Sequence, residues 1–133
     1  MSAVIVDTDV ASYLFKEDTR GDLYEPHLVG VVASISFMTL AELEQWTVLH
    51  KWGKRRHEEL MRFINSRFLV IDSDAPLCRQ WAEVQGSVAS IGRHIQTSDA
   101  WIAATAILYA APLITHNAAD FVHVPGLNVI TEA

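Results

Sequence analysis

The chain begins its ordered pattern with Ala3-Val4-Ile5-Val6-Asp7, a short apolar run that ends directly in an acid. The β-branched bias and the length of Ala3–Val6 are typical of a fully buried strand. Such strands occur mainly in parallel sheets that helices cover on both faces. A carboxylate directly beside an apolar strand is costly unless it has a partner. We therefore expect an α/β sheet with a polar site at the end of its first strand.

Three further acids stand beside apolar segments. Glu42 lies just past the strand-like run 31–37, Asp99 opens a helical segment, and Asp120 follows the strand-like run 112–115 by a few loop residues. In an open parallel sheet, acids beyond the carboxyl ends of the strands meet in one crevice. Because gathered anions repel each other, the pattern favours a crevice that holds Mg²⁺ or Mn²⁺.

Apolar strand-like runs alternate with amphipathic stretches, as in consecutive βα units. The pattern predicts strands at 4–6, 32–36, 68–71, 113–115 and 128–130. It predicts helices at 10–15, 23–29, 39–50, 55–66, 75–89 and 99–109. A doubly wound, mostly parallel α/β sheet follows.

Length and composition are those of one compact domain over residues 1–133, because half of the residues are hydrophobic and 20% are charged. No apolar stretch reaches the length of a membrane span, and no secretory leader precedes Ala3, so cytoplasmic residence is expected. The single Cys78 permits no internal disulfide, and its helix-like segment predicts a buried structural thiol.

Each acid also has an ordinary structural explanation. Asp7 and Asp9 are suited to cap the first helix, Asp99 to favour the dipole of its helix, and Asp120 to form a turn. Glu42 is harder to explain in this way, because helical spacing places it on one face with Trp46 and Leu49. A charge that faces inward needs a partner, although a long Glu can also extend out at an edge.

The net charge of −6 argues against a protein that coats nucleic acid through bulk positive charge. Six of the ten Lys and Arg residues nevertheless fall between Lys51 and Arg67. One interpretation is a solvated helix face that Glu58 and Glu59 partly neutralise. The other is a patch that grips phosphates beside an acidic crevice.

Four segments together resemble the ordered signatures of PIN-domain nucleases, and most of all the VapC toxins of type II toxin-antitoxin pairs. They are Val4-Ile5-Val6-Asp7-Thr8-Asp9, Met38-Thr39-Leu40-Ala41-Glu42-Leu43, Ser98-Asp99-Ala100-Trp101-Ile102-Ala103-Ala104-Thr105-Ala106, and Leu113-Ile114-Thr115-His116-Asn117-Ala118-Ala119-Asp120-Phe121. Each signature alone is weak, but four in order over nearly the whole chain are specific. The resemblance implies a three-layer α/β/α fold with a central sheet of about five strands.

The resemblance also implies roles for particular residues. The acidic quartet that holds Mg²⁺ or Mn²⁺ would be Asp7, Glu42, Asp99 and Asp120, with Thr8, Thr115 and Asn117 as auxiliary polar groups. Two positions depart from the family pattern, because Asp9 stands where Asn or Ser is common and His116 where Arg is frequent. The first adds either a ligand or a cap, and the second puts in doubt any substrate contact made by that Arg.

The activity that the resemblance implies is metal-dependent endoribonuclease cleavage that leaves a 5′-phosphate, with structured RNAs such as tRNA or rRNA as substrates. Two other classes with acids at strand ends, haloacid-dehalogenase-like phosphatases and response-regulator receivers, need a late lysine, and no lysine follows Lys54. The remaining alternative is a non-catalytic binding module whose acidic crevice receives a basic peptide.

Family resemblance further implies a VapB-like antitoxin that covers the crevice. An apolar groove for its tail is one interpretation of six residues that otherwise form ordinary core: Tyr13, Leu14, Phe15, Leu23, Tyr24 and Leu28. The tryptophans Trp46, Trp52, Trp81 and Trp101 add to the apolar surface and favour a homodimer. The substrate-binding residues stay unassigned at this level.

Overall fold

The computed structural model describes residues 2–133 and contains alternating strands and helices. The strands are β1 (Ala3–Val6), β2 (Val32–Ser36), β3 (Leu69–Ile71), β4 (Leu113–Ile114) and β5 (Val129–Ile130). The α-helices are α1 (Thr8–Phe15), α2 (Thr19–Asp22), α3 (Phe37–Leu49), α4 (Lys54–Arg67), α5 (Ala75–Ser90) and α6 (Thr97–Leu108). Two 3-10 helices, η1 (Glu25–Leu28) and η2 (Ala118–Phe121), complete the chain.

The five strands form one sheet in the order β3-β2-β1-β4-β5, and every neighbouring pair is parallel. The predicted mostly parallel α/β sheet of about five strands is therefore confirmed. β1 lies at the centre, where Ala3 pairs with Val32 on one side and Ile5 with Leu113 on the other. Since all the strands run the same way, their carboxyl ends share one edge of the sheet, and the loops and helices that follow them begin there.

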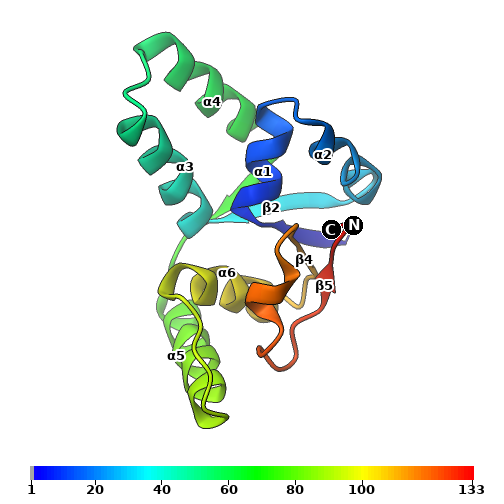
Figure 1. Cartoon of the computed structure of the whole chain (residues 1–133), viewed down its shortest axis with the longest axis vertical. Coiled ribbons are helices and arrows are strands. Elements are labelled where there is room, and N and C mark those ends of the chain that lie inside the picture. Colours follow the sequence, from blue (N-terminus) through cyan, green and yellow to red (C-terminus); the bar gives the residue numbers. More distant parts are fainter. Residues whose placement is uncertain (1) are drawn as a thin grey trace.

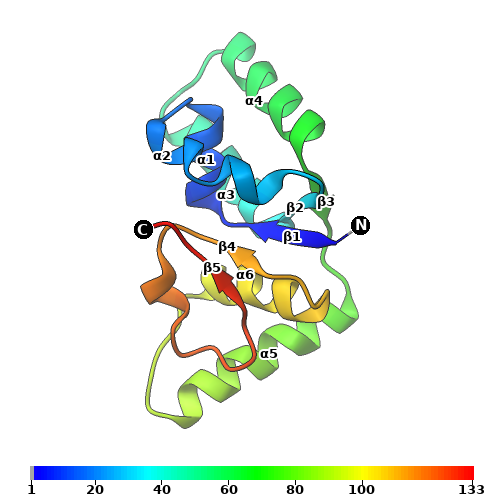
Figure 2. The same ribbon diagram turned by 90° about the vertical axis from the view of Figure 1, so that its right-hand side faces the viewer.

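Helices cover both faces of the sheet, which gives three layers (Figures 1 and 2). Val4 and Val6 of β1 pack with residues of α1, α3 and α4, while Ile5 packs with residues of α5 and α6. This alternation is the two-residue period of a strand, and all three side chains are buried. Both faces of the central strand are thus apolar, which explains why its sequence shows no polar residue before Asp7.

The segment before β2 differs from the predicted helix at 23–29, and that prediction was wrong. A short helix α2, capped by the Asp18 carboxylate that accepts from Arg20 N at 2.9 Å, precedes a 3-10 turn with Pro26 in its first turn. Proline cannot donate the backbone hydrogen bond that a longer α-helix needs. The predicted burial of Cys78 was also wrong, since this side of α5 faces solvent.

None of the helices in the part of the chain that the structure describes is long and apolar enough to cross a membrane.

Gly21 permits a close approach between α2 and α1. A Cβ atom at this buried position would lie 3.2 Å from both Leu14 N and Tyr13 C, which is tighter than an ordinary contact with backbone. We expect Gly21→Ala to lower the free energy of unfolding by about 1 kcal/mol, as measured by urea denaturation, because the two helices must shift apart.

The matched control is Gly86→Ala in α5, where an added Cβ meets nothing within 4 Å. This change should leave stability unchanged or raise it slightly, because alanine is the better helix former. Equal effects of the two substitutions would show that the α1–α2 contact is not tight.

Candidate active site

The chain delivers its acids to one edge of the sheet from four places. Asp7 follows β1 and caps α1, Glu42 lies in α3 after β2, Asp99 lies in the first turn of α6, and Asp120 lies in η2 after β4. Asp9 adds a fifth carboxylate in the first turn of α1. The capping explanation for Asp7 and the dipole explanation for Asp99 are both realised, and neither prevents these acids from meeting.

Asp7 is the most deeply placed of these acids, with 7% of its surface exposed. Its Oδ1 accepts from Thr8 N at 2.8 Å and its Oδ2 accepts from the Thr115 hydroxyl at 2.7 Å. Burial, with a contribution from the charge on Asp9, nevertheless raises the pKa of the Asp7 carboxyl to about 8. Two hydrogen bonds are therefore too few to offset the cost of a buried negative charge here.

Asp99 connects the acids electrostatically. Burial, followed in order by the charges of Asp120, Glu42 and Asp9, raises the pKa of its carboxyl to about 6. Asp99 in turn contributes to the raised pKa of Asp7. Asp99 thus lies within electrostatic reach of the other three predicted acids, Asp7, Glu42 and Asp120.

Within residues 2–133, none of the five carboxylates forms an ion pair with a lysine, arginine or histidine. Burial also raises the pKa of the Asp9 carboxyl, which accepts hydrogen bonds from Val10 N at 2.7 Å and His116 N at 3.1 Å. Carboxylates that lie close together without an ion-pair partner repel one another, and a bound cation would relieve that repulsion.

Glu42 is held by a threonine from the neighbouring helix. The Thr8 hydroxyl lies 2.6 Å from Glu42 Oε1, to which it donates, and 3.0 Å from the Thr39 hydroxyl. Glu42 is half-buried, but Leu49 on the predicted inward face is 68% exposed, so that face does not extend to the end of α3. The Glu42 carboxylate therefore has a hydrogen-bond partner, which is the Thr8 hydroxyl rather than a cation.

The loop after β4 connects the other auxiliary residues to the acids. Thr115, which donates to Asp7, also accepts from Asn117 N at 3.0 Å, and Asn117 Nδ2 donates to Asp120 Oδ2 at 2.6 Å. The three predicted auxiliary residues therefore each hydrogen-bond one carboxylate: Thr8 to Glu42, Thr115 to Asp7, and Asn117 to Asp120.

Two residues of this network were missed by the sequence reading. Thr39 lies three positions before Glu42, so helical spacing was a signal that could have found it. Tyr24, which contacts His116 from a distant part of the chain, gave no such signal, because no local pattern relates residues so far apart.

Comparison with known proteins places this geometry in a family. The PIN domain family model matches residues 4–127. The chain belongs to the PIN-domain family. Ribonuclease VapC1 of Haemophilus influenzae is 27% identical over 128 residues, which cover 92% of each chain. Ribonuclease VapC5 of Mycobacterium tuberculosis is 29% identical over 119 residues, which cover 87% of this chain and 84% of the relative.

Solved structures agree with the PIN fold. The structure of VapBC2 from Rickettsia felis, bound to a DNA fragment from its promoter, contains a chain that is similar with a TM-score of 0.83 at 25% identity, covering 98% of this chain and 99% of that one. VapBC-1 from nontypeable Haemophilus influenzae is similar with a TM-score of 0.80 at 24% identity, and 97% of each chain is covered. The predicted PIN-like architecture is thereby confirmed.

The donor set of this PIN domain fits a hard divalent cation by its chemistry, because carboxylate oxygens are the ligands that Mg²⁺ and Mn²⁺ prefer. Among residues 2–133, however, no three acid, histidine or cysteine side chains are drawn together tightly enough to form a finished metal site. Burial is the main cause of the raised pKa values of Asp7 and Asp99, and repulsion from the neighbouring carboxylates adds to it.

A cavity of about 410 Å³ adjoins the acids of this PIN domain between α1 and α3. Its lining combines acids, aromatic rings and one cation, namely Thr8, Asp9, Ser12, Tyr13, Lys16, Glu42, Leu43 and Trp46. The Lys16 ammonium lies 4.1 Å from the centre of the Trp46 ring. Six residues were predicted to form either an antitoxin groove or ordinary core. Of these, Leu14 and Tyr24 belong to the core. Tyr13 lines the cavity, and Leu23 is 47% exposed.

Two basic residues of α4 lie on a solvent-exposed helix face, as one of the two interpretations of this segment predicts. Lys54 and Arg55 form exposed i,i+4 ion pairs with Glu58 and Glu59, at 3.9 and 3.5 Å. Such pairs contribute little to stability. Arg56 instead lies over the Trp52 ring, 4.2 Å from its centre.

Proposed function

We propose that this PIN domain is a metal-dependent endoribonuclease that acts as the toxin of a VapBC-type toxin-antitoxin pair. The observation that carries the proposal is the group of buried and half-buried carboxylates Asp7, Asp9 and Asp99, whose pKa values are raised and which form no ion pair within residues 2–133. The names of its relatives support the choice of RNA as substrate, since they are ribonucleases. We also propose that residues 1–133 form a single PIN-like nuclease domain.

The carboxylates Asp7, Glu42, Asp99 and Asp120 would hold one or two Mg²⁺ or Mn²⁺ ions. A bound cation supplies an activated water and neutralises charge on the phosphate that is cut. The residues of the chain provide the positions: Thr115 and Thr8 N fix both oxygens of Asp7, and Asn117 fixes Asp120. Thr8 fixes Glu42 from the side of α1. These bonds orient acceptors that mutual repulsion would otherwise spread apart.

A VapB-like antitoxin is the proposed protein partner, because solved structures of similar fold are VapBC complexes. The cavity beside Glu42 and Asp9 supports this proposal, since its mixed lining can take an apolar side chain and a cation together. The non-catalytic binding module would use the same crevice for the same kind of peptide. A homodimer is the proposed oligomeric state of the free toxin.

RNA cleavage with and without metal separates the two functions. Purified protein is incubated with total bacterial RNA in Mg²⁺, in Mn²⁺ or in EDTA, and the fragments are resolved on a denaturing gel. We expect discrete fragments only with metal, since the carboxylates need a cation to act on a phosphodiester. If metal binds, as followed by thermal stabilisation, and RNA still stays intact, the binding module is the better description.

A further inference from the structure

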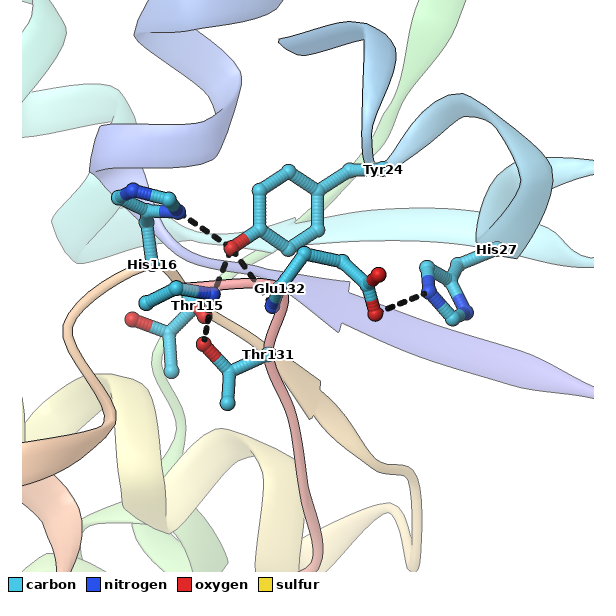
Figure 3. A network of polar contacts seen from close by, with 7 residues as sticks. Tyr24, His27, Thr115, His116, Thr131 and Glu132 are labelled. Carbon is cyan, nitrogen blue, oxygen red and sulfur yellow. Dashed lines mark hydrogen bonds and ion pairs between the residues drawn. The ribbon is translucent and has the colours of Figure 1, made fainter. Parts of the chain in front are cut away.

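Tyr24 is fully buried, yet its hydroxyl contacts three polar groups from two distant parts of the chain. The oxygen lies 2.5 Å from His116 Nδ1 and 3.4 Å from Thr115 O, and it accepts from Glu132 N at 3.0 Å (Figure 3). Buried tyrosine hydroxyls need such partners. What is unusual here is that two of the three partners belong to the loop that carries the auxiliary residues of the acidic crevice.

The hydroxyl has one proton, and the contacts decide where it goes. Glu132 N–H is a donor, so the Tyr24 oxygen accepts there and must donate elsewhere. The His116 ring nitrogen is much closer than the carbonyl of Thr115, so the proton is directed to Nδ1. In a neutral imidazole whose Nδ1 accepts, Nε2 carries the hydrogen. Tyr24 therefore selects one tautomer of His116.

The ring of His116 is also fixed in orientation. The Tyr13 and Tyr24 rings meet it edge to face, with centroids 5.5 and 5.7 Å away. With Nδ1 turned to Tyr24, the second ring nitrogen points away from it, as Figure 3 shows. His116 lies beside the acids, because its backbone N donates to Asp9 Oδ2 at 3.1 Å.

The backbone of the same loop reaches the acids directly. His116 N donates to Asp9 Oδ2, and Thr115, whose carbonyl also faces Tyr24, donates its hydroxyl to Asp7. One buried hydroxyl thus supports a histidine side chain and the loop that holds two carboxylates. Glu132 attaches this arrangement to the last described residues, where its carboxylate also lies 3.3 Å from His27.

We propose that Tyr24 is a positioning residue of this site, and that it presents His116 Nε2–H as a hydrogen-bond donor to a phosphate of the RNA substrate. The inference rests on the proposed nuclease function. It assigns a substrate contact to His116, whereas the proposed function by itself names no residue that binds the RNA. Lys16, which lines the cavity together with Asp9, lies over the Trp46 ring, so an imidazole N–H is well suited to hold the phosphate next to the acids.

Kinetics on a double-mutant cycle test the proposal. Tyr24→Phe keeps the ring but removes the hydroxyl, and we expect it to raise KM about tenfold with kcat little changed, since a hydrogen bond to a charged group changes affinity by about this factor. His116→Ala should weaken RNA binding by a similar or larger factor. In the double variant the effect of Tyr24→Phe should shrink to less than about twofold, because it acts through His116.

Two variants serve as controls. Tyr109→Phe removes an exposed hydroxyl at the end of α6 and should leave the kinetics unchanged. His116→Gln keeps an amide donor that does not need Tyr24, so Tyr24→Phe should have little effect in that background. Independent effects of Tyr24→Phe and His116→Ala that simply multiply would overturn the proposal and leave Tyr24 with a structural role only.

Nitrogen NMR of the imidazole gives a readout that does not depend on activity. At about pH 8, above the ordinary histidine pKa, ¹⁵N shifts of His116 should show Nε2–H alone in the wild type and a tautomer mixture in Tyr24→Phe. A wild-type ring protonated on Nδ1 would refute the assignment even if Tyr24→Phe failed to fold.

The same NMR measurement, with RNA binding in EDTA, separates failure of the inference from failure of the proposed function. If the protein binds RNA through His116 but does not cut it with metal, the inference about His116 stands and the proposed nuclease function fails. If the protein cuts RNA and His116→Ala binds it as well as the wild type does, the inference fails while the nuclease stands.

Discussion

Asp99→Asn is expected to reduce metal-dependent RNA cleavage by at least about a hundredfold while the protein stays folded. Asp99 is the acid whose pKa responds to the charges of Asp120, Glu42 and Asp9, so it lies where those charges converge. Asparagine preserves the volume but removes the negative charge that a divalent cation needs. Losses of this size are typical when a group that stabilises charge in a transition state is removed.

The measurement is kcat/KM on a defined RNA at saturating Mg²⁺, with circular dichroism to show that helix content is unchanged. Asp72→Asn is the matched control, since Asp72 also follows a strand but is exposed and does not contribute to the raised pKa of Asp7 or Asp99. Cleavage that survives in Asp99→Asn would mean that a contaminant or another site cuts the RNA.

Asp7→Asn is expected to stabilise the metal-free protein at alkaline pH by about 3 kcal/mol, or roughly 10 °C in Tm for a domain of this size. Burial raises the pKa of this carboxyl from 3.8 to about 8 in the folded protein. Between those values the folded state holds a proton that the unfolded state has released. The free energy of unfolding of the wild type therefore falls as pH rises from about 4 to about 8.

Thermal melts in EDTA at pH values of about 4, 6 and 8.5 check this, because the variant and the wild type should diverge only as pH rises. At about pH 4 the carboxyl is protonated in the folded state and roughly half protonated in the unfolded state, so the substitution should be nearly neutral. Mg²⁺ should stabilise the wild type more than the variant at the high pH, since a cation replaces the proton. A pH-independent difference would contradict the raised pKa of Asp7.

The sheet was predictable because its strands are short runs rich in β-branched residues. Ala3–Val6 reads as buried on both faces, and the structure confirms that Val4 and Ile5 pack into different layers. The acids were predictable for the same reason, since an acid that follows a buried strand of a parallel sheet lies at the edge where the carboxyl ends of the strands meet. The helix predicted at 23–29 does not form, because Pro26 lacks the backbone N–H that a longer α-helix needs there.

The polar network behind the acids was beyond sequence reasoning. Thr39 had a helical spacing to Glu42 that could have been used, whereas Tyr24 and Glu132 meet across the whole chain. Apolar spacing also made Leu49 look buried, although it lies near the end of α3, where the helix has left the sheet and the side chain is 68% exposed. Periodicity identifies the face of a helix, and only tertiary structure shows how far along the helix that face is covered.

Two of the bonds that complete the crevice, Thr115 to Asp7 and Glu132 N to Tyr24, each join residues 108 positions apart. Translation delivers Asp7 and Tyr24 first and their partners last. A nascent chain still held by the ribosome has the acids of β1 and α1 but not the loop that orients them. We therefore expect the hydrogen bonds that orient the crevice to form only after residues near 130 have emerged and reached Asp7 and Tyr24.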